Sequence, residues 1–166
     1  ERRHFTSSEI LSVYGQIGVS LLVYDRTGAA DNKLAPYRQT LIVDGRRVFV
    51  STYDWIAYAD AHQVFMDRTR LGFPGGAGRF YNLFRASGNR LDLYGRVADG
   101  GGLLSCGVGS GEAFLKKGLH QLVVESEDVA GNKSRALLQV RVNAAPALGP
   151  LRLIDERGIV YLQAVA

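Results

Sequence analysis

The sequence predicts an all-β protein built as an antiparallel β-sandwich, and three observations support this. Two alternating runs rich in Leu and Val, residues 118–127 and 133–142, flank a turn closed by Gly131-Asn132, which is typical of a β-hairpin. A second hairpin is indicated by Asp44-Gly45, again between alternating runs. The chain also contains 20 Gly and only 4 Pro, a composition that suits many tight turns and few long helices.

Each predicted strand is an alternating or β-rich run bounded by turn residues. Turn-rich stretches at 25–36 and 99–102 and the loop 72–78 separate them. Residues 53–70 combine aromatic rings with Asp, Ala and His, and the sequence leaves extended chain and a short helix open there. The predicted strands before the closing hairpin are residues 10–14, 17–25, 37–44, 46–50, 79–84 and 90–94, and residues 103–115 follow the second glycine-rich loop.

Composition along the chain predicts one β-sandwich domain over residues 10–142. Residues 143–150, rich in Ala and Pro, then read as a linker. Residues 151–166 contain one more hairpin, and a lone hairpin is marginal in water. We expect it to begin a further module or to dock onto the first domain.

The charge balance argues against a nucleic-acid-binding protein. The 20 basic and 16 acidic residues leave a net charge of +4, and the basic residues are scattered rather than clustered. Weak attraction to an anionic wall or outer-membrane glycan stays open. The single cysteine, Cys106, is expected to be a buried small hydrophobe. No run is long enough for a transmembrane helix, no signal peptide is evident, and a start at Glu1 suggests a fragment of a longer protein.

Short motifs in a fixed order give the sequence a resemblance to a known class of module. They include the strand before Asp44-Gly45, the run 80–84 leading to 88–94, and the stretch from 118 to Asn132. Over residues 15–142 this order resembles the immunoglobulin-like β-sandwich modules attached to lysostaphin-like (LytM-type) zinc endopeptidases of bacterial envelopes. The resemblance implies an exported, periplasmic or extracellular domain beside a peptidoglycan-directed peptidase.

The catalytic zinc motif of that family is missing from this chain. Its ligands come from an H-x-x-x-D and an H-x-H motif, whereas the 3 histidines here, His4, His62 and His120, form neither. We therefore expect no enzyme and no cofactor in this chain, with zinc held only in a missing peptidase domain.

Acidic residues near the closing turn allow a calcium site as an alternative to a turn cap. Asp128, with Glu125, Glu127 and Asn132, offers oxygen ligands, but the spacing is not that of a calcium loop. Asp in this turn more often caps the backbone itself, and we favour that interpretation.

An aromatic group in the middle of the chain suggests the most specific binding hypothesis. Tyr53, Trp55 and Tyr58 are the candidate ligand-binding residues, since exposed rings stack on sugars and Asp54 or Asp60 can bind hydroxyls. A sandwich also needs rings in its core, and we favour the core interpretation. An exposed Trp55 would instead favour carbohydrate binding.

A hydrolytic enzyme is a third hypothesis with little support. A glycosidase needs two carboxylates across a cleft, and the sequence does not fix the distances between its candidate acids. No G-x-S-x-G motif and no phosphate-loop lysine is present. The candidate acids are Asp54, Asp60, Asp67 and Asp92.

The sequence thus predicts a non-catalytic accessory or scaffold domain of an exported envelope protein. Its expected partner is a neighbouring domain of the same protein, without nucleic acid and without a membrane span. The alternative is a carbohydrate-binding module for cell-wall glycan, peptidoglycan included, that uses an aromatic platform.

Overall fold

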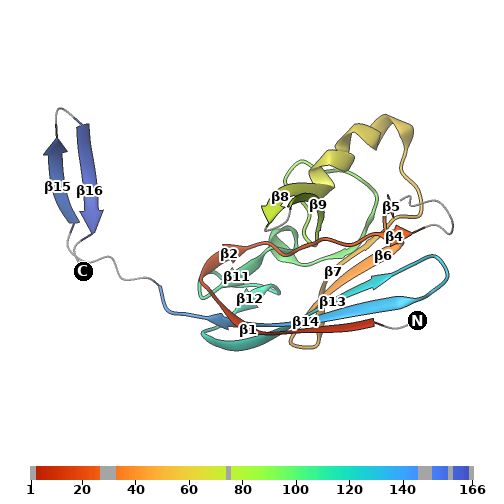
Figure 1. Cartoon of the computed structure of the whole chain (residues 1–166), viewed down its shortest axis with the longest axis horizontal. Helices are drawn as coiled ribbons and strands as arrows, with labels where there is room; N and C mark the ends of the chain where they lie inside the picture. Colours follow the sequence, from red (N-terminus) through yellow and green to blue (C-terminus); the bar gives the residue numbers. More distant parts are fainter. Residues whose placement is uncertain (1–2, 27–32, 74–75, 146–150, 157–158, 165–166) are drawn as a thin grey trace.

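A computed structural model gives the structure of this protein, and it describes all residues except 1–2, 27–32, 74–75, 146–150, 157–158 and 165–166 (Figure 1). Strands account for 51% of the chain and helix for 11%, which confirms the all-β class. The elements are β1 (Arg3–Val13), β2 (Gly15–Ile17), β3 (Ser20–Leu21), β4 (Asp25–Arg26), β5 (Lys33–Leu34), β6 (Arg38–Val43), β7 (Arg46–Thr52), η1 (Tyr58–Asp67), β8 (Arg68–Phe73), β9 (Gly76–Asn82), β10 (Tyr94–Val97), η2 (Asp99–Gly102), β11 (Leu104–Cys106), β12 (Phe114–Leu115), β13 (Gly118–Glu127), β14 (Lys133–Val142), β15 (Leu151–Glu156) and β16 (Ile159–Ala164).

The main layer is a six-stranded sheet in the order β1-β14-β13-β6-β7-β10. Both predicted hairpins are confirmed in it: β13 pairs antiparallel with β14, and β6 pairs antiparallel with β7. Asp44 and Gly45 take φ values of 48° and 80°, the left-handed pair that a tight two-residue hairpin turn requires. The edge strand β1 runs parallel to β14 and starts earlier than the predicted strand at residue 10.

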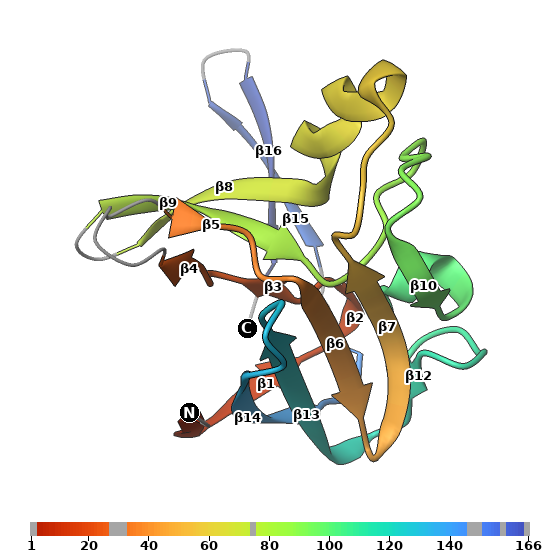
Figure 2. The same cartoon turned by 90° about the vertical axis from the view of Figure 1, so that its right-hand side faces the viewer.

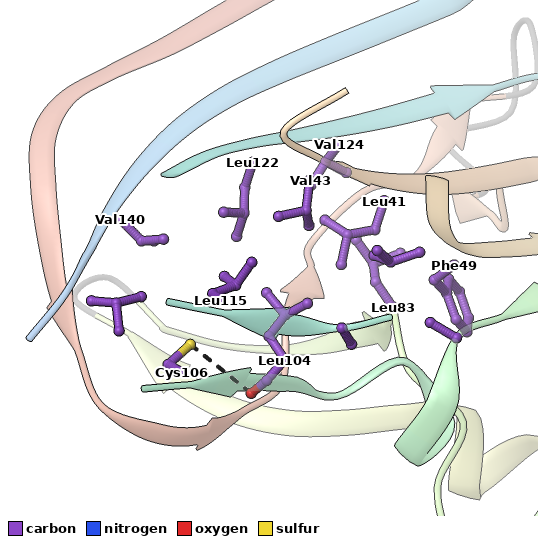
Figure 3. Packing of buried hydrophobic residues seen from close by; sticks show 14 residues of the cluster. Leu41, Val43, Phe49, Leu83, Leu104, Cys106, Leu115, Leu122, Val124 and Val140 are labelled. Carbon is purple, nitrogen blue, oxygen red and sulfur yellow. Dashed lines mark hydrogen bonds between the residues drawn. The ribbon is translucent and has the colours of Figure 1, made fainter. Parts of the chain in front are cut away.

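The hydrophobic core lies between this sheet and the small sheet β12-β11-β2 (Figure 3). Alternate residues of the long strands, such as Leu41 and Leu122, meet Leu104 and Leu115 from the small sheet. Cys106 is fully buried in this core, as the sequence predicted, and burial raises the pKa of its thiol.

The predicted strand at 17–25 is wrong as one continuous element. The chain there forms β2, β3 and β4, which belong to three different sheets. The change of sheet follows Gly18, where a Cβ would lie 2.6 Å from Cε1 of Phe84. Close contact with this ring leads the chain out of one sheet and into the next.

The third sheet, β3-β9-β8, supports the segment whose conformation the sequence left open. Residues 58–67 of that segment form the 3₁₀ helix η1, which leads directly into β8. In Figure 2 the chain leaves the end of β7 and carries η1 away from the six-stranded sheet. The predicted strand at 79–84 is β9, shifted toward the N-terminus, whereas residues 90–93 form no strand.

The predicted C-terminal hairpin is present as β15 and β16, which pair with each other from Leu151↔Ala164 to Glu156↔Ile159. Of the predicted linker, residues 143–145 are exposed and outside any strand, and the rest lies outside the described residues. The two possible roles of this hairpin remain predictions.

Candidate functional site

The segment between β7 and β8 presents large apolar side chains to solvent. Trp55 is 63% exposed, Tyr58 97% and Phe65 72%. The expectation that Trp55 and Tyr58 fill the core is therefore wrong. Exposed rings grouped in one short segment are a common mark of a binding surface.

The helix η1 sets which of these side chains face outward. Gln63 and Asp67 form its buried side, whereas Tyr58, His62 and Phe65 are exposed. Seven residues separate Tyr58 from Phe65, a rise of about 14 Å in 3₁₀ geometry. No side chain caps the N-terminus at Ala57, so tertiary contacts must hold the helix in place.

Tyr53, the third predicted platform residue, turns inward. Its ring meets Tyr81 edge-on, with the centroids 5.9 Å apart, and its hydroxyl donates a hydrogen bond to Oδ2 of Asp67. The structure therefore places Tyr53 half-buried beneath the segment, where its hydroxyl and ring support the exposed part.

Asp67 is the central anchor of the segment. It is only 1% exposed, and Tyr94 donates a second hydrogen bond, of 3.0 Å, to its Oδ1. Burial raises the pKa of the Asp67 carboxyl more than the hydrogen bonds from Tyr53 and Tyr94 lower it. Burial and the nearby carboxylate also raise the pKa of both tyrosines well above the usual value.

Further polar contacts fix η1 to the rest of the domain. Gln63 accepts a hydrogen bond of 2.6 Å from the Arg90 amide and donates one of 3.0 Å to Asp60. Asn82 on β9 accepts hydrogen bonds from Ser20 and Thr69 at 3.0 Å and 2.7 Å. These contacts hold the segment that carries the exposed rings in one conformation. This reduces the conformational entropy that is lost when a ligand binds.

The four candidate catalytic acids have different surroundings. Asp67 is buried beneath the segment, and Asp60 accepts a hydrogen bond from Gln63. Asp54 accepts a hydrogen bond from Tyr37, which raises the pKa of that tyrosine, and Asp92 is exposed.

The histidines and the closing turn show no metal-binding arrangement. In the described part of the chain, no three His, Cys, Asp or Glu side chains come together as metal ligands. His62 bonds the Ala59 carbonyl, and the side chain of His4 lies outside the described residues. Asp128 accepts 2.9 Å hydrogen bonds from the amides of Ala130 and Asn132, as the predicted turn cap requires.

A second surface feature is a groove of about 370 Å³ on the six-stranded sheet. Strands β6, β7, β10, β13 and β14 contribute to it, so residues far apart in sequence meet there. In the sequence the basic residues are scattered along the predicted strands, so no local cluster indicates this groove. The lining residues are Arg38, Thr40, Arg47, Val50, Thr52, Gly95, Arg96, Glu125, Glu127 and Lys133.

Comparisons with protein-family models, curated proteins and solved structures return no match. Of the helices that the structure describes, none has the length and apolar character needed to cross a membrane.

Proposed function

We propose that this chain is a non-catalytic glycan-binding module with an immunoglobulin-like β-sandwich fold, from an exported bacterial envelope protein. The observation that carries the binding role is the exposure of Trp55 beside Tyr58 on an anchored segment. The envelope location and a neighbouring zinc endopeptidase domain come from the sequence resemblance alone. Peptidoglycan is the ligand that this context favours.

Exposed aromatic rings suit carbohydrate because a sugar ring has an apolar face and a polar edge. The indole of Trp55 and the phenol of Tyr58 can cover such a face, and removing both surfaces from water stabilises the complex. Asp60 and His62, on η1 between Tyr58 and Phe65, supply polar groups for the hydroxyls at the edge.

The rigid base beneath the rings supports a binding role over a flexible surface loop. Asp67 holds Tyr53 and Tyr94 at once, so η1 is tied to β7 and β10. A preformed segment loses little conformational entropy when a ligand arrives. The buried carboxylate thus serves the site as support, without contact with the ligand.

The direct test is sedimentation of the chain with purified peptidoglycan sacculi at low and at high salt. Trp55→Ala and Tyr58→Ala should each weaken binding about tenfold, the equivalent of 1.4 kcal/mol. The weakening should persist at high salt, because stacking on a ring is not screened by ions.

Val129→Ala is the matched control, since Val129 is 85% exposed on the closing turn, outside this segment. It should bind as the unchanged chain does. Failure of the unchanged chain to bind sacculi would overturn the proposal, and so would equal losses in all three variants.

A further inference from the structure

The groove on the six-stranded sheet has a floor of small side chains and walls of long charged ones. On β6 and β7 the floor consists of Thr40, Val50 and Thr52, which alternate with core residues and so face away from the core. Gly95 on β10 keeps the floor open, because a Cβ there would meet only Cγ1 of Val50, at 3.9 Å. The missing side chain makes this part of the sheet concave.

The walls carry more positive than negative charge. Four basic residues, Arg38, Arg47, Arg96 and Lys133, line the groove with two acidic ones, Glu125 and Glu127. Both acidic side chains already form ion pairs with basic neighbours. Arg38 and Lys133 lie 3.5 Å and 3.4 Å from Glu127, and Arg135 lies 3.6 Å from Glu125.

Arg47 is the group left to bind a ligand. Its carbonyl accepts a hydrogen bond of 2.8 Å from Arg96, whose guanidinium also pairs with Glu112 at 3.2 Å. The Arg47 guanidinium itself has no hydrogen-bond or ion-pair partner in the described ranges of the chain. A free guanidinium at the wall of a groove is suited to a planar, two-oxygen anion such as a carboxylate.

The groove and the aromatic segment lie along the same stretch of chain. Thr52, the last residue of β7, lines the groove, and Trp55 follows three residues later, at most about 11 Å along the chain. Arg47 lies five residues before Thr52, about 17 Å along the strand, so only a glycan longer than a disaccharide would contact both Arg47 and Trp55.

We infer that the groove binds the carboxylate-bearing unit of an acidic glycan, with Arg47 holding the carboxylate. This inference rests on the proposed glycan-binding function and names its ligand class. Thr40 and Thr52 supply hydroxyls, and Glu125 an acceptor, for the hydroxyl groups of the acidic sugar.

The test is calorimetric titration of the whole chain with a glucuronate-containing disaccharide and with its neutral glucose counterpart. The acidic disaccharide should bind about tenfold tighter, as one charge-assisted bidentate contact provides. Arg47→Gln should remove this preference, and Gly95→Val should do the same by filling the groove. Circular dichroism checks that both variants fold.

Arg141→Gln is the matched control, because it makes the same charge change on β14 away from the groove. It should keep the preference. Loss of the preference in Arg141→Gln would show attraction to net charge and overturn the inference, as would equal affinity for both disaccharides or no binding of the acidic one.

The variant Trp55→Ala separates this inference from the proposed function. It should leave the affinity of the acidic disaccharide for the groove unchanged, whereas it should weaken binding to sacculi. Undiminished binding of sacculi by Trp55→Ala would overturn the aromatic site, and the effect of Arg47→Gln on the acidic disaccharide would still decide the groove.

Discussion

His120 and Asp44 form an ion pair that ties the tip of the β6–β7 hairpin to strand β13. Nδ1 of His120 donates to Oδ2 of Asp44 at 2.6 Å, and Nε2 donates to the Lys116 carbonyl at 2.8 Å. Because a carboxylate and a carbonyl only accept, both ring nitrogens must carry protons, and His120 is an imidazolium. Burial lowers the pKa of His120, but the hydrogen bonds to Asp44 and Lys116 outweigh it, so the pKa is raised.

This pair predicts a stability that falls as the pH rises. A raised folded pKa stabilises the protein below the unfolded value of 6.5, and the contribution is lost as the pH passes the folded pKa. We expect His120→Gln to lower the free energy of unfolding most near pH 5.5 and less near pH 8.5. These values lie about one unit below and about two units above the pKa of a free histidine. Urea unfolding at both pH values measures this difference.

Asp44→Asn provides the control for this prediction. Burial raises the pKa of Asp44, but hydrogen bonds from His120 and the Gln121 amide more than offset this, so its contribution is lost only as the pH falls below 3.8. Asn tolerates the φ of 48° at this turn and still accepts from Gln121. The variant should show the same loss of pH dependence as His120→Gln, and an unchanged dependence would contradict the ion pair.

Removing one donor from Asp67 should destabilise the fold in a pH-dependent way. Tyr53→Phe leaves a buried carboxylate with one tyrosine donor instead of two, at a cost of about 1–3 kcal/mol. The raised pKa of Asp67 means that its contribution is present below 3.8 and lost as the pH rises through the folded pKa. The penalty should therefore grow between about pH 4.5 and pH 7.5 in urea unfolding.

Tyr81→Phe is the matched control for the Asp67 prediction. Its ring contacts Tyr53 edge-on, and the two hydroxyls bound to Asp67 come from Tyr53 and Tyr94. It should leave the pH dependence unchanged. A Tyr53→Phe penalty equal at both pH values would show that Asp67 does not titrate in this range.

Gly18 should tolerate no side chain, whereas Gly95 should accept one. Gly18→Ala would place a Cβ 2.6 Å from Cε1 of Phe84 and 3.2 Å from Cδ2 of Leu103, so the ring must move. Overpacking of this kind costs about 1–3 kcal/mol. Gly95→Ala, with 3.9 Å to Val50, should change stability far less in the same thermal unfolding experiment. Equal melting temperatures for the two variants would contradict the close contact at Gly18.

Replacing Gln39 by Met should stabilise the protein. Gln39 is fully buried on β6, and neither Nε2 nor Oε1 has a hydrogen-bond partner among the residues that the structure describes. A side chain of similar size without these polar atoms removes their desolvation cost, and we expect a gain of about 1 kcal/mol. Gln63→Met, which removes hydrogen bonds with Asp60 and Arg90, should lose stability in the same assay. A loss at both positions would show that Gln39 is satisfied in solution.

Local turn chemistry explains why both main hairpins could be predicted. Asp44-Gly45 and the Asp128 turn depend on residues within a few positions of each other, and the alternation beside them sets the strands. The break at Gly18 could not be predicted in this way, because the ring that causes it belongs to Phe84, far along the chain.

The sequence predicted which residues belong to the candidate site, but it did not predict the directions of their side chains. The sequence singled out Tyr53, Trp55 and Tyr58, yet an aromatic ring suits both a core and a binding surface. Their directions follow from the buried Asp67, which draws Tyr53 inward and fixes η1 so that Tyr58 faces out. The groove around Arg47 joins five strands, and no local pattern in the sequence brings them together.

The parallel pairing of β1 with β14 determines how the domain responds to pulling. Their register runs from Arg3↔Ser134 to Val13↔Val142, interrupted between Thr6 and Ile10. Tension applied before Arg3 and after Val142 would act along both strands and in opposite directions. The hydrogen bonds between β1 and β14 would then share the load in shear instead of breaking one by one. The domain can therefore transmit mechanical force while its sheet stays intact.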